Sequence, residues 1–230
     1  MKMRTSENGN ALVMVLIIVG LFGLLSAVVL GLGKSGSPAQ GQRAVEMGIN
    51  EMMRYAASLE NTVYTMIMID NVADTAISFE HADDSPSTLH QNANCTNNIC
   101  KVFDIVGGGI TWRQPPEAVA ADTADNYYII SGASSIYGHG TDGADAADAE
   151  LFLTASITED ACVAAGDILN VPFSDATGPE DDFLNPAFTG AYSSTSGKVI
   201  DHADLQGMKA FCFKNTTDSK YYFVYVLHSR

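Results

Sequence analysis

Four cysteines are the residues whose type and spacing point most directly to a chemistry, which is disulfide formation. They are Cys95, Cys100, Cys162 and Cys212. An even number of cysteines, in a segment that the hydropathy pattern below predicts to be exported, favours disulfides over free thiols, and four cysteines allow three pairings. We favour Cys95–Cys100, which closes the short loop CTNNIC, and Cys162–Cys212, which would tie a helix to a strand. Zinc is the competing chemistry, but there is no second closely spaced cysteine pair and no histidine at ligand spacing.

Two acidic clusters supply the carboxylate oxygens that calcium takes as ligands. Neither cluster follows the alternating ligand pattern of an EF-hand loop, and a solvated acidic loop is the competing interpretation. We therefore predict no metal site and no cofactor. If calcium binds at all, the candidate ligands lie in the segment SDATGPEDDF, which has a Gly and a Pro for a tight turn. These candidates are Asp175, Glu180, Asp181 and Asp182, and the other cluster is Asp142, Asp145, Asp148 and Glu150.

The five histidines are scattered over predicted loops and one strand end, and we expect them to be exposed. None lies in a motif for nucleophilic catalysis or metal binding, and the chain has no G-x-S-x-G turn. We predict no catalytic residue and no enzymatic activity. A membrane-anchored hydrolase is the alternative, and it would need a pocket that gathers a histidine with acids. The histidines are His81, His90, His139, His202 and His228.

The hydrophobic residues of this acidic chain are concentrated in one segment. The 230 residues include 12 Lys and Arg against 27 Asp and Glu, a net charge of −15. This charge argues against a basic surface that would bind nucleic acid, so no nucleic-acid partner is predicted. From Ala11 to Gly33 the chain has 23 residues without a charge, which as a helix would span the roughly 30 Å hydrocarbon core of a bilayer. We predict a transmembrane helix over residues 10–33.

The charges around this span predict its orientation. Lys2 and Arg4 precede it, so the positive-inside rule keeps the amino terminus in the cytoplasm and exports the remainder. Residues 35–230 hold 9 basic and 26 acidic residues, a net charge of −17. The alternative is a secretory signal peptide that is removed near Ser35, but the apolar run is long for that class.

After the span we expect a flexible break, a second helix and then strands. Gly and Pro residues interrupt residues 34–41. Apolar residues then recur every three or four positions, which predicts an amphipathic helix over residues 42–70. Residues 71–230 are predicted to form an acidic globular region. The apolar stripe of the helix is Ile49, Met52, Met53, Ala56, Leu59, Val63, Met66 and Ile67.

The globular region contains five runs that are rich in β-forming residues and one more helical pattern. The helix should begin at the cap Thr158 and end near Asn170. The fold class is therefore α+β, with a long amino-terminal helix, half transmembrane and half amphipathic, packed on a mostly antiparallel sheet. The predicted strands are Lys101–Ile105, Tyr127–Ser131, Leu151–Ile157, Lys209–Lys214 and Tyr221–Leu227.

The amino-terminal residues Gly9 to Ile17, GNALVMVLI, resemble those of type IV pilin-like proteins, the prepilins and pseudopilins. Those proteins have a short basic leader that ends in Gly, followed by an uninterrupted apolar helix. The resemblance implies a cytoplasmic leader over residues 1–9 and cleavage after Gly9 by a prepilin peptidase, which would methylate Asn10 as the new amino terminus. The family usually has an aromatic or similar residue where this chain has Asn10.

The resemblance also implies a role. The family usually has a glutamate at the fifth mature position, where this chain has Met14, and its absence is similar to minor or tip subunits. The chain would then be a non-catalytic subunit of a type IV pilus-like or type II secretion pseudopilus filament, anchored once in the inner membrane, with its exported domain in the periplasm or on the filament. Its partners would be other pilin-like subunits, the assembly platform and the peptidase. The alternative is a singly anchored periplasmic or surface-exposed binding domain that joins no filament.

Overall fold

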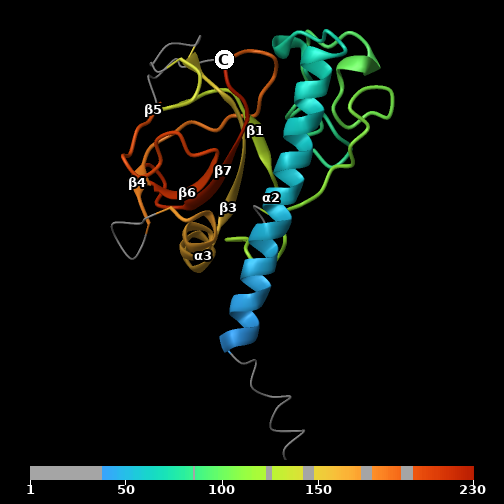
Figure 1. Ribbon diagram of the computed structural model, residues 1–230. Coiled ribbons are helices and arrows are strands. Elements are labelled where there is room, and N and C mark those ends of the chain that lie inside the picture. The colour runs from blue at the N-terminus through green and yellow to red at the C-terminus, as the bar shows by residue number, and fades with distance from the viewer. Residues whose placement is uncertain (1–37, 85, 123–125, 142–147, 172–177, 193–198) are drawn as a thin grey trace, which may run out of the picture. The chain divides into compact units, whose positions relative to one another are not determined.

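The computed structural model describes residues 38–84, 86–122, 126–141, 148–171, 178–192 and 199–230 (Figure 1). Residues 44–230 form one compact unit, and all the packing described below lies within it. No helix in these described stretches is both long enough and apolar enough to cross a membrane. The predicted leader, the transmembrane span and the residues Gly9, Asn10 and Met14 lie outside the described residues.

Helix α2, Pro38–Met68, is the long helix that the apolar periodicity predicts. It begins at Pro38, inside the segment predicted as a break, and a proline is well suited to the first turn because its missing N–H would be unpaired there. Asn71, with φ 53°, adopts the left-handed conformation that asparagine tolerates, and the chain turns there. Six residues of the predicted stripe are fully buried or nearly so: Ile49, Met52, Ala56, Leu59, Val63 and Met66.

The stripe of α2 packs on a five-stranded sheet with the order β1-β3-β7-β6-β4 (Figure 1). Neighbours from β1 to β6 are antiparallel, and β4 is parallel to β6. The predicted α+β class with a mostly antiparallel sheet is therefore confirmed. The strands are β1 Ile129–Ser131, β3 Leu151–Ile157, β4 Glu180–Asp181, β6 Ala210–Asn215 and β7 Tyr221–His228, and a separate parallel pair consists of β2 Ser135–Ile136 and β5 Val199–Ile200.

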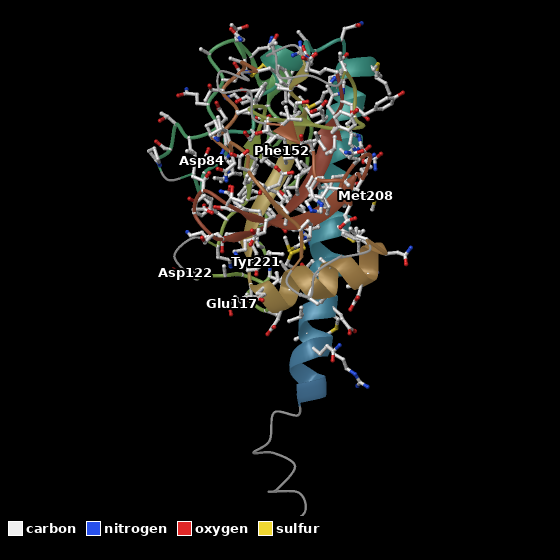
Figure 2. All side chains as sticks on the ribbon, turned by 90° about the vertical axis from the view of Figure 1, so that its left-hand side faces the viewer. Asp84, Glu117, Asp122, Phe152, Met208 and Tyr221 are labelled. Atoms are coloured by element: carbon white, nitrogen blue, oxygen red, sulfur yellow. A yellow bond between two sulfur atoms is a disulfide. The ribbon has the colours of Figure 1, made fainter. Side chains whose placement is uncertain are left out.

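Strands β3 and β7 are predominantly apolar because both of their faces are buried. In β7, Phe223 and Tyr225 belong to the cluster that contains the α2 stripe, whereas Val224 and Val226 belong to a second cluster. Alternate side chains of a strand point to opposite faces, so a strand between two apolar clusters is mostly apolar at every position rather than at every second one. Phe152 of β3, labelled in Figure 2, belongs to the second cluster.

Helix α3, Glu159–Leu169, has the caps that its sequence predicts. The hydroxyl of Thr158 accepts a hydrogen bond from the Ala161 amide, and Asn170 ends the helix with a left-handed φ of 55°. Both favoured disulfides are present: Cys95–Cys100 closes its short loop, and Cys162–Cys212 joins α3 to β6. Disulfides of this kind are typical of exported domains.

The predicted strand Lys101–Ile105 is wrong. Lys101 makes one isolated bridge to Ser78, and the chain then turns. Asp104 drives the turn, because its carbonyl accepts hydrogen bonds from the amides of Gly107 and Gly109 and its side chain accepts one from Val106. The two-residue strands β2, β4 and β5 and the short 3₁₀ helices η1, Asp74–Ala76, and η2, Asn98–Cys100, carry no sequence pattern that predicts them.

Candidate functional site

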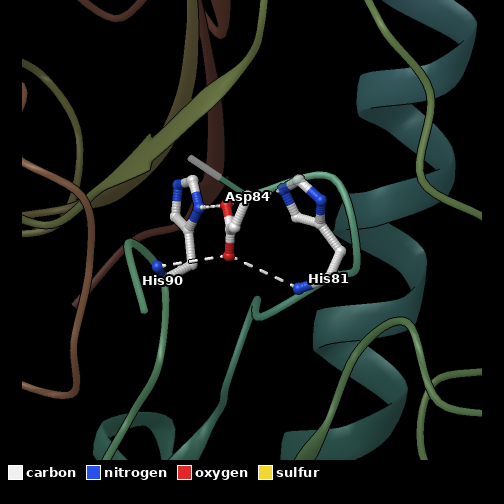
Figure 3. A group of neighbouring side chains, drawn as sticks. All are labelled: His81, Asp84 and His90. Carbon is white, nitrogen blue, oxygen red and sulfur yellow. Dashed lines mark hydrogen bonds and ion pairs between the residues drawn. The ribbon is translucent and has the colours of Figure 1, made fainter. Parts of the chain in front are cut away.

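His81, Asp84 and His90 form a buried polar cluster in the loop that follows η1 (Figure 3). Oδ1 of Asp84 lies 2.7 Å from Nδ1 of His90 and 2.9 Å from Nε2 of His81. Oδ2 of the same carboxylate accepts the backbone N–H groups of His81 and His90, both at 3.4 Å. The side chain of Asp84 is only 1% exposed, so one buried carboxylate holds two imidazoles and their backbone together.

The partners of His90 fix its protonation. Nδ1–H donates to Asp84, and Nε2 accepts the backbone N–H of Ile130 at 3.3 Å. Ile130 lies in the edge strand β1, and its carbonyl accepts a hydrogen bond from Phe188. His90 therefore satisfies an edge-strand amide that has no neighbouring strand. Burial lowers the pKa of His90, which is consistent with a neutral ring.

His81 is held differently. Its ring stacks on Trp112, with 3.6 Å between ring centroids and 14° between planes, and its side chain is 6% exposed. Nε2 is close to Asp84 but poorly aligned for a hydrogen bond, and Nδ1 has no partner. Two lone pairs facing each other at 2.9 Å would repel, so the proton belongs on Nε2 and the lone pair on Nδ1 is unused. Burial lowers the pKa of His81 and favours this neutral form.

The three side chains have the donor types of a transition-metal site, and their donor atoms lie within 4.8 Å of one another. A neutral imidazole, however, has one lone pair. The lone pair of His90 on Nε2 already accepts the N–H of Ile130. A metal bound to Nδ1 would place the ring proton on Nε2, where two N–H donors would face each other, or it would require an imidazolate. The residues fit a hydrogen-bonded network better than a metal centre.

The expectation of exposed histidines is wrong for His81 and His90. They gather with an acid, as the hydrolase alternative requires, but among the described residues no serine, threonine or cysteine side chain hydrogen-bonds either ring. His90 cannot act as a general base because Nε2 faces an amide rather than a nucleophile. His139, His202 and His228 belong to other segments.

Two hollows share residues 109–111 as a common wall, and one of them adjoins the cluster. One, of about 590 Å³, is lined by His81 and Trp112. The other, of about 1090 Å³, is the α2 groove, which lies between α2 and residues 108–113. A side chain at Gly108 would meet the Thr62 methyl group at 2.5 Å, which shows how closely this segment follows the helix.

The described calcium candidates are occupied by other contacts. Glu180 forms an ion pair with Lys214 at 2.6 Å. Asp181 accepts the backbone amides of residues 182, 201 and 202, and it organises the loop after β5. Glu150 is fully buried and accepts the Ile136 amide at 2.7 Å. Asp142, Asp145 and Asp175 lie outside the described residues, and Asp182 and Asp148 lie near Asp181 and Glu150 in the sequence.

Trp112, the only tryptophan in the chain, should report the protonation of His81. A cationic imidazole stacked on an indole quenches its fluorescence, so emission should fall as the pH drops below the ordinary histidine value of 6.5. The lowered folded-state pKa means that the unfolded chain binds the proton first. The contribution of His81 to stability is therefore fully present above pH 6.5 and is lost as the pH falls toward and through its folded-state pKa.

A fluorescence titration with parallel urea unfolding checks this prediction. His81→Phe should abolish the quenching and His202→Ala should retain it. An emission that stays constant as acid is added to the folded protein contradicts it.

The residue of the cluster that sequence reasoning missed is Asp84. The available signal was four imidazole or carboxylate groups within ten positions, at His81, Asp83, Asp84 and His90. No family model, curated protein or solved structure matches the chain.

Proposed function

We propose that the chain is a non-catalytic, pilin-like subunit of an envelope filament, of the type IV pilus or type II secretion pseudopilus kind, in a minor or tip position. The observation that carries the proposal is that α2 follows the apolar run closely in the sequence. A helix that begins at Pro38 follows 23 uncharged residues within a few positions, and its far half is buried on an antiparallel sheet. This is the arrangement that the amino-terminal resemblance implies.

In this role the apolar segment would hold the subunit in the inner membrane, with its amino terminus in the cytoplasm. On assembly it would exchange lipid for the helices of neighbouring pilin-like subunits. The two disulfides support an exported location for the domain. Met14, in place of the usual glutamate, removes the acid that would neutralise a neighbouring amino terminus and therefore favours a minor position over a repeated one.

A second candidate is a singly anchored, exported binding domain. It is favoured by the α2 groove, because a volume of about 1090 Å³ is large enough to hold a small molecule. This domain would be anchored by the same segment but would enter no filament.

The processing of the amino terminus separates these candidates. Mass spectrometry of the chain from its native membrane should find a first residue Asn10 that carries a methyl group. Gly9→Trp should leave the leader attached and trap the chain in the membrane, whereas Ser35→Trp should not affect processing. An intact Met1, or a cut near Ser35, contradicts the filament proposal.

A further inference from the structure

His90 joins its loop to the sheet through a hydrogen bond that only one protonation state of the ring can make. Nε2 accepts the backbone N–H of Ile130 at 3.3 Å, and Ile130 lies in edge strand β1. Both residues are fully buried, so the contact is shielded from solvent. A histidine that gains a second proton carries N–H on both ring nitrogens and can no longer accept. Protonation of His90 would therefore place two donors face to face at this contact.

Asp84 is the charged group that faces the ring of His90, with Oδ1 at 2.7 Å from Nδ1 (Figure 3). His81 is the titratable neighbour in the same loop, at 5.8 Å between ring centroids. Glu80 lies on the side of the His90 carbonyl and is paired with Lys101 at 2.7 Å. The indole and the strand that pack on the ring from other segments bring no charge. Burial outweighs the carboxylate, so the pKa of His90 lies below its ordinary value.

The contacts on both sides of this hydrogen bond do not depend on pH in the same way. Nδ2 of Asn92 donates to the carbonyls of Thr75 and Ile77 at 2.9 and 2.7 Å, and an amide does not titrate. The carbonyl of Ile130 accepts the backbone N–H of Phe188 at 2.7 Å. Acid should therefore break the ring contact while the backbone on either side stays in place.

The lowered pKa gives the direction of the response. The closed contact binds the proton less readily than a released ring, whose pKa returns toward the ordinary value of 6.5. The contact is therefore fully favoured above pH 6.5 and is lost as the pH falls toward and through the folded-state pKa of His90.

We propose that His90 is a pH-dependent switch, which holds the Ile130 N–H of edge strand β1 in neutral solution and releases it in acid. The two disulfides favour an exported domain, and such a domain meets the pH of its surroundings. A histidine whose protonation changes one contact between two elements is a common basis for pH sensing. The switch goes beyond the filament role and is compatible with either candidate function.

Hydrogen exchange of the Ile130 amide, in the full chain in detergent, tests the switch. The rates are corrected for the pH dependence of chemical exchange. Protection of this amide should be constant above pH 6.5 and should then fall about tenfold for each pH unit, because each opening takes up one proton. The amides of the central strand β7 should keep their protection over the same range, which separates local release from unfolding.

Two variants identify the group that titrates. In H90Q the side-chain oxygen can accept the Ile130 N–H and does not titrate, so protection should no longer depend on pH. H81F is the matched variant, since it removes the other histidine of the cluster, and it should keep the tenfold fall. If H90Q does not fold, nitrogen NMR of the parent ring gives the same test, because Nε2 should gain its proton over the pH range in which Ile130 loses protection.

Three results would overturn the proposal. The first is protection of Ile130 that does not change with pH in the parent protein. The second is a fall that persists in H90Q or disappears in H81F. The third is a loss of protection in β7 that accompanies the loss at Ile130, because the acid response would then be unfolding of the whole domain.

Discussion

Asp84→Ala is expected to lower the free energy of unfolding by about 3 kcal/mol or more, because three buried N–H donors lose their acceptor at about 1–3 kcal/mol each. The carboxylate is 1% exposed and accepts Nδ1–H of His90 at 2.7 Å. Its loss leaves that donor and two backbone N–H groups unpaired in the interior, and it frees the ring that holds the Ile130 amide. Edge strand β1 should therefore lose protection from hydrogen exchange together with the loop.

Urea unfolding followed by circular dichroism measures this effect, and Asp83→Ala is the matched control. Asp83 is the neighbouring residue with the same chemistry, but it is exposed, so its replacement should change stability by no more than about 0.5 kcal/mol. If the two variants are equally stable, the cluster does not hold the loop to β1.

Local patterns predict the parts of this fold whose structure is decided locally. The three- and four-residue spacing of apolar residues from Ile49 to Met66 gives α2, and Thr158 and Asn170 mark the ends of α3 within a residue. The continuous apolar run of β7 predicts a strand, because only burial on both faces explains it.

The site depends on contacts that no local pattern encodes. His90 meets Ile130 across 40 residues, and His81 meets Trp112 across a loop that turns at Asp104. Residues 101–105 are rich in β-forming side chains and so resemble a strand, but the glycines that follow permit a tight turn, which leaves Ile105 92% exposed. The sequence alone therefore predicts histidines in loops, and the fold makes two of them part of the interior.

The second large effect is expected from the disulfide between α3 and β6. Replacing both Cys162 and Cys212 by alanine opens a loop with a sequence separation of 50 residues. The chain-entropy model assigns such a loop about 4 kcal/mol, and a further cost follows because both side chains are fully buried in the cluster with the α2 stripe. In a protein of this size the loss should lower Tm by roughly 8–16 °C.

The other disulfide provides the control for this prediction. Cys95–Cys100 closes a loop with a separation of only 5 residues, for which the same model assigns about 2 kcal/mol. Cys95→Ala with Cys100→Ala should therefore cost about half as much, and it should loosen the loop of residues 95–100 without detaching α3 from the sheet. Thermal unfolding of the two double variants under oxidising conditions compares them directly. If opening the short loop costs as much as opening the long one, loop closure is not the source of the stabilisation and packing around the sulfur atoms must supply it.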